Sequence, residues 1–543
     1  MRKNIRRECP PPVNSIRELI DGAAGRGGEK TAYRYKAGGE VKDVSFEQFR
    51  VFTDNIGAAL AEMGLDRAHI ACIGRNSFEY IAAYLTVLGG NGTFVPIDKE
   101  LTPEEKLHLL SDSDSEAVFC DEKNIGTVLE NSDKLPGIKY VFSLEPECDS
   151  AETIYSLAER GKDLPRRKFD YRPDKTKLLI YTSGTTGIAK GVMLTEHNLV
   201  SSVCCGLEVS QIYDCGLSVL PYHHAYEAVC DILVSLHFGS TLCISESLKN
   251  VVQEMQFYKP SYIYLVPAFA DVFYAAIRRQ IRKSGKEKKF GTAVLLSDSM
   301  RKVGIDLRPK LFADIQKNFG GRLKKIVCGG APIRPEVGRF FDTVGLTLVG
   351  GYGITECSPL VCVNDELTRN DFDTCGTRLR CIEWKIDSPD SDGAGEVLVK
   401  GDVVMKGYYK QPEKTAEVFT EDGFFRTGDY GIITSDDRLI ITGRKKNIVV
   451  MSNGKNVYPE EIEKYIARIE YVSECVVRGI KNSRGDEVGL EAEIYCPDRT
   501  DEEKVLADVQ EMLSCLPAYK NVSRVILRDS PFEKTTSNKI KRQ

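Results

Sequence analysis

Short apolar runs alternate with amphipathic helical stretches up to about residue 240, and this alternation constrains the fold more than any other feature. Residues 70–73 and 93–96 have the composition of short buried strands, whereas residues 45–63 and 78–88 have the apolar spacing of helices. Parallel strands need crossover connections, which are usually helical. The pattern therefore predicts a doubly wound, parallel α/β sheet.

A second sheet of the same kind is expected further along the chain. The alternation recurs around residues 262–266 and 325–328, so a large N-terminal body with two such sheets is predicted. Between residues 377 and 441, short strands alternate with Gly/Asp turns, which is typical of a small antiparallel β-barrel or sheet. The chain length of 543 residues allows three or four structural units.

The last hundred residues have the pattern of a separate small α+β domain. Two helices and three strands are predicted there, at residues 459–469, 475–479, 490–496, 502–516 and 525–527. We therefore expect an N-terminal domain over residues 1–443 and a mobile C-terminal domain over residues 444–543.

The composition of the chain limits the kinds of partner and the cellular compartment that we expect for the protein. Lys plus Arg number 74 against 79 acidic residues, a net charge of -5, which argues against nucleic acid as a partner. The N-terminus lacks the apolar core of a signal peptide, and 17 scattered cysteines are typical of free thiols, so a cytoplasmic protein is expected. Residues 278–289, with seven basic residues and one acid, predict a solvated helix end or loop. The alternative for this segment is peripheral contact with an anionic membrane surface or cofactor.

The strongest local motif is an apolar strand that runs into a loop rich in glycine and hydroxyl groups. Residues 178–181 are followed by TSGTTGIAKG, which combines four hydroxyls, three glycines and one lysine. Glycines let backbone N–H groups turn toward an anion, and hydroxyls and lysine add donors and charge, so the loop predicts polyphosphate binding. It is not a Walker A loop, because Lys190 precedes Gly191 rather than a hydroxyl residue. A surface turn rich in Ser, Thr and Gly is the structural alternative.

YTSGTTGIAKG resembles the signature loop of the adenylate-forming superfamily, which contains acyl-CoA synthetases, peptide-synthetase adenylation domains and luciferases. Ala189 replaces the family's usual proline. Six further motifs occur in the family's order, namely LPYHHAYE (220–227), CGGAPI (328–333), GGYGITE (350–356), RTGDYG (426–431), GRKKNIVVMSNGKNVYPEEIE (443–463) and TTSNKIKR (535–542). The resemblance implies that ATP and a carboxylic acid form an acyl-adenylate with release of pyrophosphate. A thiol, coenzyme A in the simplest case, then takes the acyl group.

The resemblance also assigns the nucleotide site. Loop residues would hold the β- and γ-phosphates, with Thr182, Ser183, Thr185 and Lys190 as donors and Gly184, Thr186 and Gly187 shaping the loop. The residues that would contact the purine and the α-phosphate are Gly330, Ala331, Pro332, Gly351, Tyr352, Gly353 and Thr355.

Four side chains receive more specific roles from the resemblance. Glu356 would be a ligand for Mg²⁺, which prefers carboxylate oxygen. His224 would lie near the substrate carboxylate. Asp429 would accept hydrogen bonds from both ribose hydroxyls, and Arg444 would be the neighbouring cation.

The resemblance places three functions in the C-terminal domain. Lys539, in Asn-Lys where the family has Gly-Lys, would bridge the carboxylate and the α-phosphate, although other basic residues flank it. Lys446 would be the hinge about which this domain rotates between the half-reactions. Gly454 would then line the thiol tunnel.

The identity of the acid stays open at this stage. The His-x-x-Glu pattern of His224 and Glu227 resembles that of long-chain fatty acyl-CoA synthetases, which implies a long-chain fatty acid. An aryl or sterol-type acid is the alternative. The phosphopantetheine of a carrier protein is the alternative thiol. Two rivals from other classes are a P-loop-type switch or kinase and a catalytically inactive scaffold.

Overall fold

The chain divides into two compact units. The computed structural model describes residues 9–182, 189–365, 371–451, 456–482, 487–497, 501–534 and 540–542. Unit 1 comprises residues 1–383 and 400–423, and unit 2 comprises residues 384–399 and 424–543. The polypeptide thus passes between the units three times. The mobile domain expected over residues 444–543 stays a prediction.

One of the two large sheets of unit 1 has eight strands among the described residues. In spatial order they are β19 (Gly407–Tyr408), β9 (Lys190–Thr195), β8 (Thr176–Thr182), β4 (Thr93–Ile97), β3 (His69–Ile73), β5 (Ser115–Cys120), β6 (Tyr140–Ser143) and β7 (Glu152–Thr153). From β8 to β7 neighbouring strands are parallel, whereas β9 and β19 join antiparallel. The strands predicted at residues 70–73 and 93–96 are β3 and β4, at its centre.

The other large sheet of unit 1 has nine strands in the part of the chain described. Their order is β16 (Thr377–Arg378), β15 (Leu360–Val363), β14 (Thr347–Gly353), β13 (Lys325–Cys328), β12 (Tyr262–Leu265), β10 (Cys215–Ser218), β11 (Thr241–Ile244), β1 (Thr31–Ala37) and β2 (Glu40–Ser45). The central strands from β14 to β1 are parallel. The expected pair of largely parallel α/β sheets is therefore confirmed.

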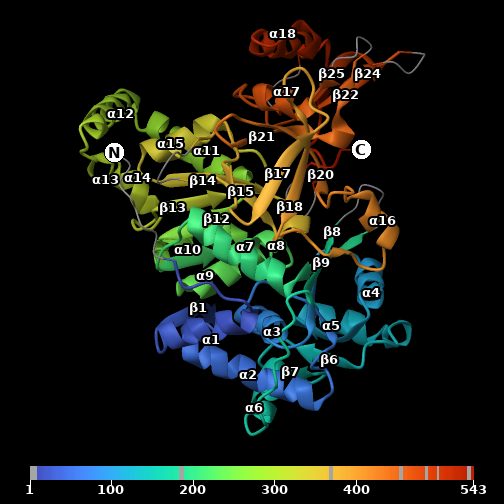
Figure 1. Cartoon of the computed structure of the whole chain (residues 1–543). Coiled ribbons are helices and arrows are strands. Elements are labelled where there is room, and N and C mark those ends of the chain that lie inside the picture. The colour runs from blue at the N-terminus through green and yellow to red at the C-terminus, as the bar shows by residue number, and fades with distance from the viewer. Residues whose placement is uncertain are drawn as a thin grey trace. The chain divides into compact units, whose positions relative to one another are not determined.

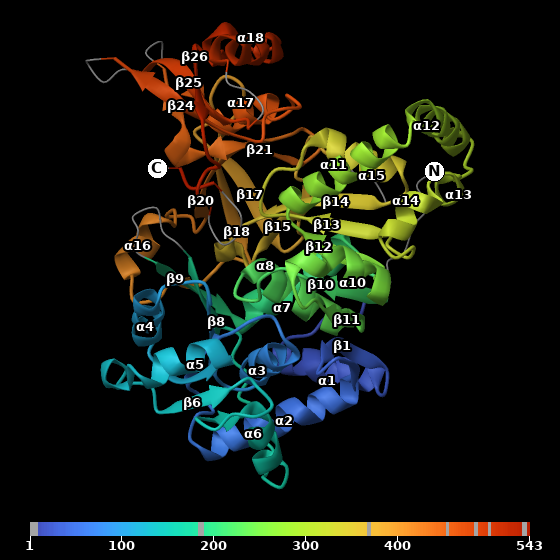
Figure 2. The ribbon, with the colours of Figure 1, turned by 180° about the vertical axis from the view of Figure 1, so that it is seen from behind.

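Helices cover these sheets (Figures 1 and 2). The longer helices of unit 1 are α1 (Ile16–Gly27), α2 (Phe46–Glu62), α3 (Phe78–Leu88), α4 (Pro103–Asp112), α5 (Glu122–Leu129), α6 (Ile154–Gly161), α7 (Glu196–Val209), α10 (Val251–Tyr258), α11 (Pro267–Lys283), α12 (Glu287–Lys302) and α15 (Pro335–Thr343). Its shorter helices are α8 (Ala225–Glu227), α9 (Val234–Phe238), α13 (Arg308–Leu311), α14 (Ala313–Asn318) and α16 (Pro412–Glu417). Ser45 and Gln48 form a capping box that sets the start of α2. Among the described residues, no helix has the length and apolar character needed to cross a bilayer.

A four-stranded antiparallel sheet, most of which belongs to unit 2, occupies the region predicted as a small barrel or sheet. Its order is β17 (Ile382–Asp387), β18 (Gly395–Gly401), β20 (Phe425–Ile433) and β21 (Leu439–Arg444). In the described chain β17 and β21 form its two edges and do not pair with each other, so the expected barrel is wrong. Four strands are fewer than the roughly five of small partly open barrels.

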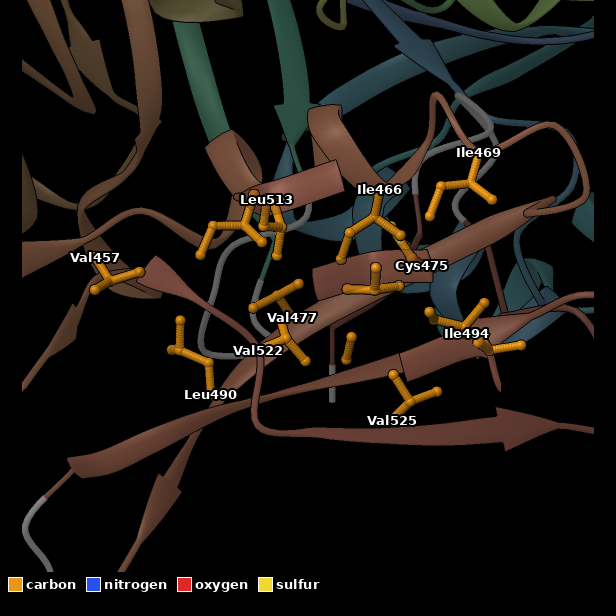
Figure 3. Packing of buried hydrophobic residues seen from close by; sticks show 14 of the residues in the cluster. Val457, Ile466, Ile469, Cys475, Val477, Leu490, Ile494, Leu513, Val522 and Val525 are labelled. Atoms are coloured by element: carbon orange, nitrogen blue, oxygen red, sulfur yellow. The ribbon is translucent and has the colours of Figure 1, made fainter. Parts of the chain in front are cut away.

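The rest of unit 2 is a compact α+β assembly around one apolar cluster. The sheet β24-β25-β26 (Glu474–Lys481, Glu487–Tyr495, Arg524–Arg528) lies against α17 (Pro459–Ile466) and α18 (Glu502–Leu513). Figure 3 shows the cluster between them, with Ile466, Val477, Leu490, Ile494, Leu513 and Val525 among the labelled side chains. The predicted order of two helices and three strands is confirmed, and α17 and α18 both end three residues before the predicted positions.

Leu490 offers a direct test of this cluster, because its side chain is fully buried. We expect Leu490→Ala to lower the free energy of unfolding of unit 2 by about 2–5 kcal/mol, through lost burial and a residual cavity. Val488→Ala, on the same strand and 51% exposed, is the matched control and should change it by less than about 0.5 kcal/mol. Trp384 is the single tryptophan and belongs to unit 2, so its fluorescence reports the transition in urea. Equal effects of the two substitutions would contradict this packing.

Candidate functional site

The predicted phosphate loop connects two antiparallel strands of the eight-stranded sheet. Pairing of β8 with β9 sets Thr182 opposite Lys190. The two ends of the loop are therefore held together by a hairpin. Five of the predicted donors and glycines, namely Ser183, Gly184, Thr185, Thr186 and Gly187, lie outside the described residues.

A tyrosine joins two of the predicted nucleotide-site residues in unit 1. The Lys190 Nζ lies 4.8 Å from the centroid of the Tyr408 ring. The Tyr408 hydroxyl donates a hydrogen bond to Glu356 Oε1 at 3.0 Å. Burial, together with the Glu356 carboxylate, raises the pKa of Tyr408, so the hydroxyl keeps its proton and remains a donor. Lys190 and Glu356, far apart in sequence, thus contact the same side chain.

Tyr408 was not found by sequence reasoning. It lies on the two-residue strand β19, where Tyr408 pairs with Val192 of β9. A strand of two residues has no periodicity that a sequence pattern can detect. The cross-strand pairing that places Tyr408 beside Lys190 is a tertiary feature.

The carboxyl ends of parallel strands bring most of the remaining unit 1 candidates to one edge of the nine-stranded sheet. Residues 220–227 follow β10, the turn at residues 330–332 follows β13, and Thr355 and Glu356 follow β14. Because β10, β12, β13 and β14 run parallel, these segments emerge on the same side. Ligands in open α/β sheets bind at this edge.

The turn after β13 is exposed, as a ligand-contacting turn must be. Gly330, Ala331 and Pro332 are all exposed, and Gly330 has φ +82, a left-handed conformation that favours glycine. The preceding Gly329 leaves room for the Tyr226 ring, which a Cβ there would approach to 3.2 Å. The Tyr226 hydroxyl also donates to the carbonyl oxygen of Val327 at 3.1 Å, which ties α8 to β13.

The glycines of the GGYGITE motif make close contact between β14 and its neighbour possible. A Cβ on Gly353 would lie 1.7 Å from the carbonyl oxygen of Pro359, and one on Gly351 would lie 3.1 Å from that of Cys362. Both positions therefore serve the packing of β14 against β15. Tyr352 between them is half-buried, and Thr355 and Glu356 form a 3₁₀ turn directly after the strand.

The double histidine meets a carboxylate from the other sheet of unit 1. His223 Nε2 lies 3.4 Å from Asp98 Oδ2, and Asp98 directly follows β4. The rings of His223 and His224 are 4.2 Å apart. Burial lowers the pKa of His223, although Asp98 opposes the shift, so this imidazole is neutral at neutral pH. His223 thus helps to join the carboxyl edges of the two sheets beside the predicted acid-binding residue His224.

Two fully buried carboxyl groups follow the histidines. Glu227 accepts a hydrogen bond from the Ser218 hydroxyl at 2.5 Å, and Asp231 lies four residues later in a π-helical turn over Ala228–Leu233. Burial raises the pKa of Glu227 well above its usual value, and the neighbouring Asp231 adds to the shift. Burial also raises the pKa of Asp231, to about 7. The pair therefore retains at least one proton at neutral pH. Asp231 was missed because it lies outside every motif that the sequence analysis singled out.

In unit 2, strand pairing joins the two residues predicted at the ribose. Asp429 and Arg444 are opposite each other on β20 and β21, and Arg444 Nε lies 2.7 Å from Asp429 Oδ1. The Asp429 side chain is buried, whereas that of Arg444 is 45% exposed. The carboxylate is thus held by a cation that keeps contact with solvent.

Of the remaining site residues predicted in the C-terminal region, one is exposed and two lie outside the described residues. Lys446 is exposed in a 3₁₀ turn between β21 and β22 (Val449–Val450), while its neighbour Lys445 forms an ion pair with Glu396 at 2.8 Å. Gly454 and Lys539 lie outside the described residues. Two cations near Lys539 have partners in unit 2, because Lys534 pairs with Glu474 at 2.6 Å and Arg542 pairs with Glu463.

Comparison with known proteins assigns the family. Residues 20–409 match the model of the AMP-binding enzyme family, which is more than half of the chain. The chain is therefore an α/β protein that belongs to the AMP-binding enzyme family.

Curated relatives with similar sequences are long-chain acyl-CoA synthetases and ligases by name. The chain is 28% identical over 415 residues to long chain acyl-CoA synthetase 6, peroxisomal, of Arabidopsis thaliana, covering 71% of this chain and 59% of that protein. It is 29% identical over 429 residues to the long-chain-fatty-acid–CoA ligase FadD15 of Mycobacterium bovis, covering 74% and 69%. The chain thus spans about three fifths of the length of the first of these relatives.

Two solved structures share the fold. ATP-bound MatB from Rhodopseudomonas palustris aligns with a TM-score of 0.78 at 22% identity, over 97% of each chain. The anthranilate CoA ligase AuaEII in complex with anthranoyl-AMP aligns with a TM-score of 0.77 at 16% identity, over 98% of this chain and 96% of that one. At these identities the likeness shows the fold alone.

The buried pair predicts a pH dependence of stability, and Asp231→Asn should remove the part that Asp231 contributes. An unfolded Asp ionises near pH 4, whereas folded Asp231 holds its proton up to about pH 7, so the wild type loses stability as pH rises through this interval. We therefore expect the free energy of unfolding of Asp231→Asn, measured relative to wild type, to increase between about pH 4 and pH 7. Urea denaturation followed by circular dichroism measures it, with the exposed Asp133→Asn as control. A pH-independent difference would contradict the shift.

Proposed function

We propose that this protein activates a carboxylic acid with ATP and transfers the acyl group to coenzyme A. The observation that carries the proposal is the contact of Lys190 and Glu356 with one buried tyrosine, in a chain of the AMP-binding family. A lysine at the end of a phosphate loop and a carboxylate that shares its tyrosine contact suit a nucleotide polyphosphate and its metal ion. In this reaction a carboxylate oxygen attacks the α-phosphorus of ATP and pyrophosphate leaves. The thiol sulfur then attacks the acyl carbonyl, loses its proton, and AMP leaves.

The donors of unit 1 have separate tasks in the first step. Lys190 and Thr182, with Ser183 and Thr185, hold the β- and γ-phosphates and the departing pyrophosphate. Thr355 donates to the α-phosphate, and Tyr352 with the turn at residues 330–332 contacts the purine. Stabilising the charge that develops at the transferring phosphoryl group is the principal contribution of such preorganised donors.

Glu356 fits the role of the magnesium ligand in this proposal. Mg²⁺ in nucleotide sites is commonly held by one or two carboxylates together with substrate phosphates. Bound Mg²⁺ would neutralise phosphate charge, and the Tyr408 hydrogen bond orients the Glu356 carboxylate.

A long-chain fatty acid is the proposed substrate. Two of the relatives described above are named as long-chain acyl-CoA ligases, and the His224-to-Glu227 spacing agrees with that class. An aryl acid is the second candidate, because a structure with the same fold is an anthranilate CoA ligase. His224 would lie near the carboxylate in either case.

Unit 2 would supply the ribose contacts and the catalytic lysine. The Asp429 carboxylate, held by Arg444, can accept from both ribose hydroxyls. Lys539 would bridge the acid carboxylate and the α-phosphate. The ion pairs of Lys534 and Arg542 support this choice, since these two nearby cations already have structural partners.

A rotation of residues 444–543 about Lys446 would occur between the two half-reactions. It would replace the face that contains Lys539 with the region around Gly454, which would line the thiol tunnel. Hinges are short segments at the ends of elements that absorb a change in φ and ψ. The exposed 3₁₀ turn that contains Lys446 is such a segment.

Lys539→Ala should slow adenylation by at least about 10²–10³, the scale for losing one preorganised charged contact. Thioester formation from supplied acyl-adenylate should survive, because that step no longer needs the bridge to the α-phosphate. Pyrophosphate exchange and thioester release measure the two steps separately. Lys541→Ala is the matched control and should retain both. Equal loss of both half-reactions in Lys539→Ala would contradict its role.

Lys446→Pro should keep pyrophosphate exchange and lose thioester formation, because proline fixes φ at the hinge. Lys446→Ala removes the same side chain without fixing the backbone, so it should retain most of both activities. Normal thioester output from Lys446→Pro would refute the hinge.

The acid-dependent exchange of pyrophosphate into ATP, across acids of graded chain length and aryl acids, tests the proposed function. Exchange that is strongest with long-chain acids, followed by acyl transfer to coenzyme A, is the expected result. Acyl transfer only to a carrier protein would identify the other thiol. Release or transfer of the γ-phosphate without pyrophosphate would overturn the proposal.

A further inference from the structure

Helix α12 has apolar side chains on two opposite sides. On its inner side Phe290 packs against Phe312 and Phe340, with ring centroids 5.5 and 6.0 Å apart, and Ser297 is buried. On its outer side Leu295 is 71% exposed and Leu296 is 47% exposed. The inner contacts anchor the helix, so the exposed leucines are not needed for its packing within unit 1.

The outer apolar residues recur in register with lysines. Lys288, Leu295 and Lys302 are spaced by seven residues, as are Lys289, Leu296 and Val303, and this spacing puts each set on one side of a helix. Val303, which caps the helix, is 70% exposed, and all three lysines are exposed. We call these six residues the α12 outer face.

The surroundings of the α12 outer face are strongly basic, in a chain whose net charge is -5. Residues 278–310 contain eleven Lys or Arg and three Asp or Glu, a local net charge of +8. Each of the acids pairs with an arginine: Glu287 with Arg282 at 3.7 Å, Asp298 with Arg301 at 4.0 Å and Asp306 with Arg308 at 2.8 Å. In the described chain, Lys288, Lys289 and Lys302 form no ion pair, so their charge is available to an external anion.

We propose that the α12 outer face docks on the surface of an anionic lipid bilayer, with the helix lying in the plane of the interface. Interfacial helices combine an apolar strip that enters the acyl boundary with lysines that meet anionic headgroups. Figures 1 and 2 place α12 at the periphery of the nine-stranded sheet's helical cover, where it can meet such a surface. The protein would rest on the membrane without crossing it.

Two other occupants fit the α12 outer face less well. A nucleic acid would match the charge, but a phosphate backbone gains nothing from three exposed apolar side chains. A second copy of this chain would bury the leucines, but a self-complementary contact would set its lysines against identical lysines. An anionic lipid surface matches both the charge and the apolar residues.

The purified full chain, sedimented with vesicles, tests this proposal. Binding to vesicles of phosphatidylcholine mixed with phosphatidylglycerol should exceed binding to phosphatidylcholine alone and should weaken at high salt. Lys288→Glu/Lys289→Glu should reduce the partition coefficient at least about tenfold, since each lysine near an anionic surface contributes about fivefold. Leu295→Ser/Leu296→Ser should reduce it at least about tenfold through lost apolar burial.

Matched controls lie elsewhere on unit 1. Lys123→Glu/Lys134→Glu changes the same charge on exposed residues, and Val252→Ser/Phe257→Ser removes exposed apolar side chains from α10. Both controls should bind anionic vesicles within about twofold of wild type, and circular dichroism should show all four variants folded.

Three results would overturn the proposal. Vesicle binding by the α12 variants that equals that of the controls would exclude this face. Binding of the wild type to a DNA duplex in preference to anionic vesicles would assign the face to nucleic acid. Self-association of the wild type, lost in Leu295→Ser/Leu296→Ser without vesicle binding, would assign it to a second copy.

Discussion

Parallel pairing of β10, β12, β13 and β14 is the constraint on which the site in unit 1 depends. Because of this pairing, the histidine segment at residues 220–227, the glycine turn at residues 330–332 and the Thr355–Cys357 turn all lie at one edge of the sheet. The other sheet contributes Asp98 at the carboxyl end of β4 and Lys190 at the start of β9. In the proposed function these side chains would handle two anions together, and the backbone hydrogen bonds of the two sheets fix the segments that present them.

Strong local signals explain what the sequence predicted well. Helix α3 begins and ends at the predicted residues, because the Ser77 side chain caps its start and most of its residues are apolar. The predicted partnership of Asp429 with Arg444 appears as an ion pair across β20 and β21. In α3 one short segment contains the information that the structure uses, whereas Asp429 and Arg444 were expected together only from the family resemblance.

What the sequence could not predict depends on contacts between distant segments. Tyr408 gains its position from the pairing of β19 with β9. Asp231 has a raised pKa because it is buried in the π-helical turn over Ala228–Leu233. The closure of the small sheet was predicted wrongly, because alternation identifies strands and not whether the edge strands meet. The glycines of GGYGITE lie close to carbonyl groups of the chain itself. Composition alone cannot tell whether a glycine makes room for the chain or for a ligand.

The most direct test of the proposed function follows an oxygen atom from the acid. If the carboxylate attacks the α-phosphorus of ATP, one of its oxygens leaves on AMP when the thiol takes the acyl group. Incubation with a long-chain acid labelled with ¹⁸O in its carboxylate, ATP, Mg²⁺ and coenzyme A should give AMP that contains one ¹⁸O atom by mass spectrometry. Unlabelled AMP, or label in inorganic phosphate with ADP as the product, would contradict the adenylate mechanism.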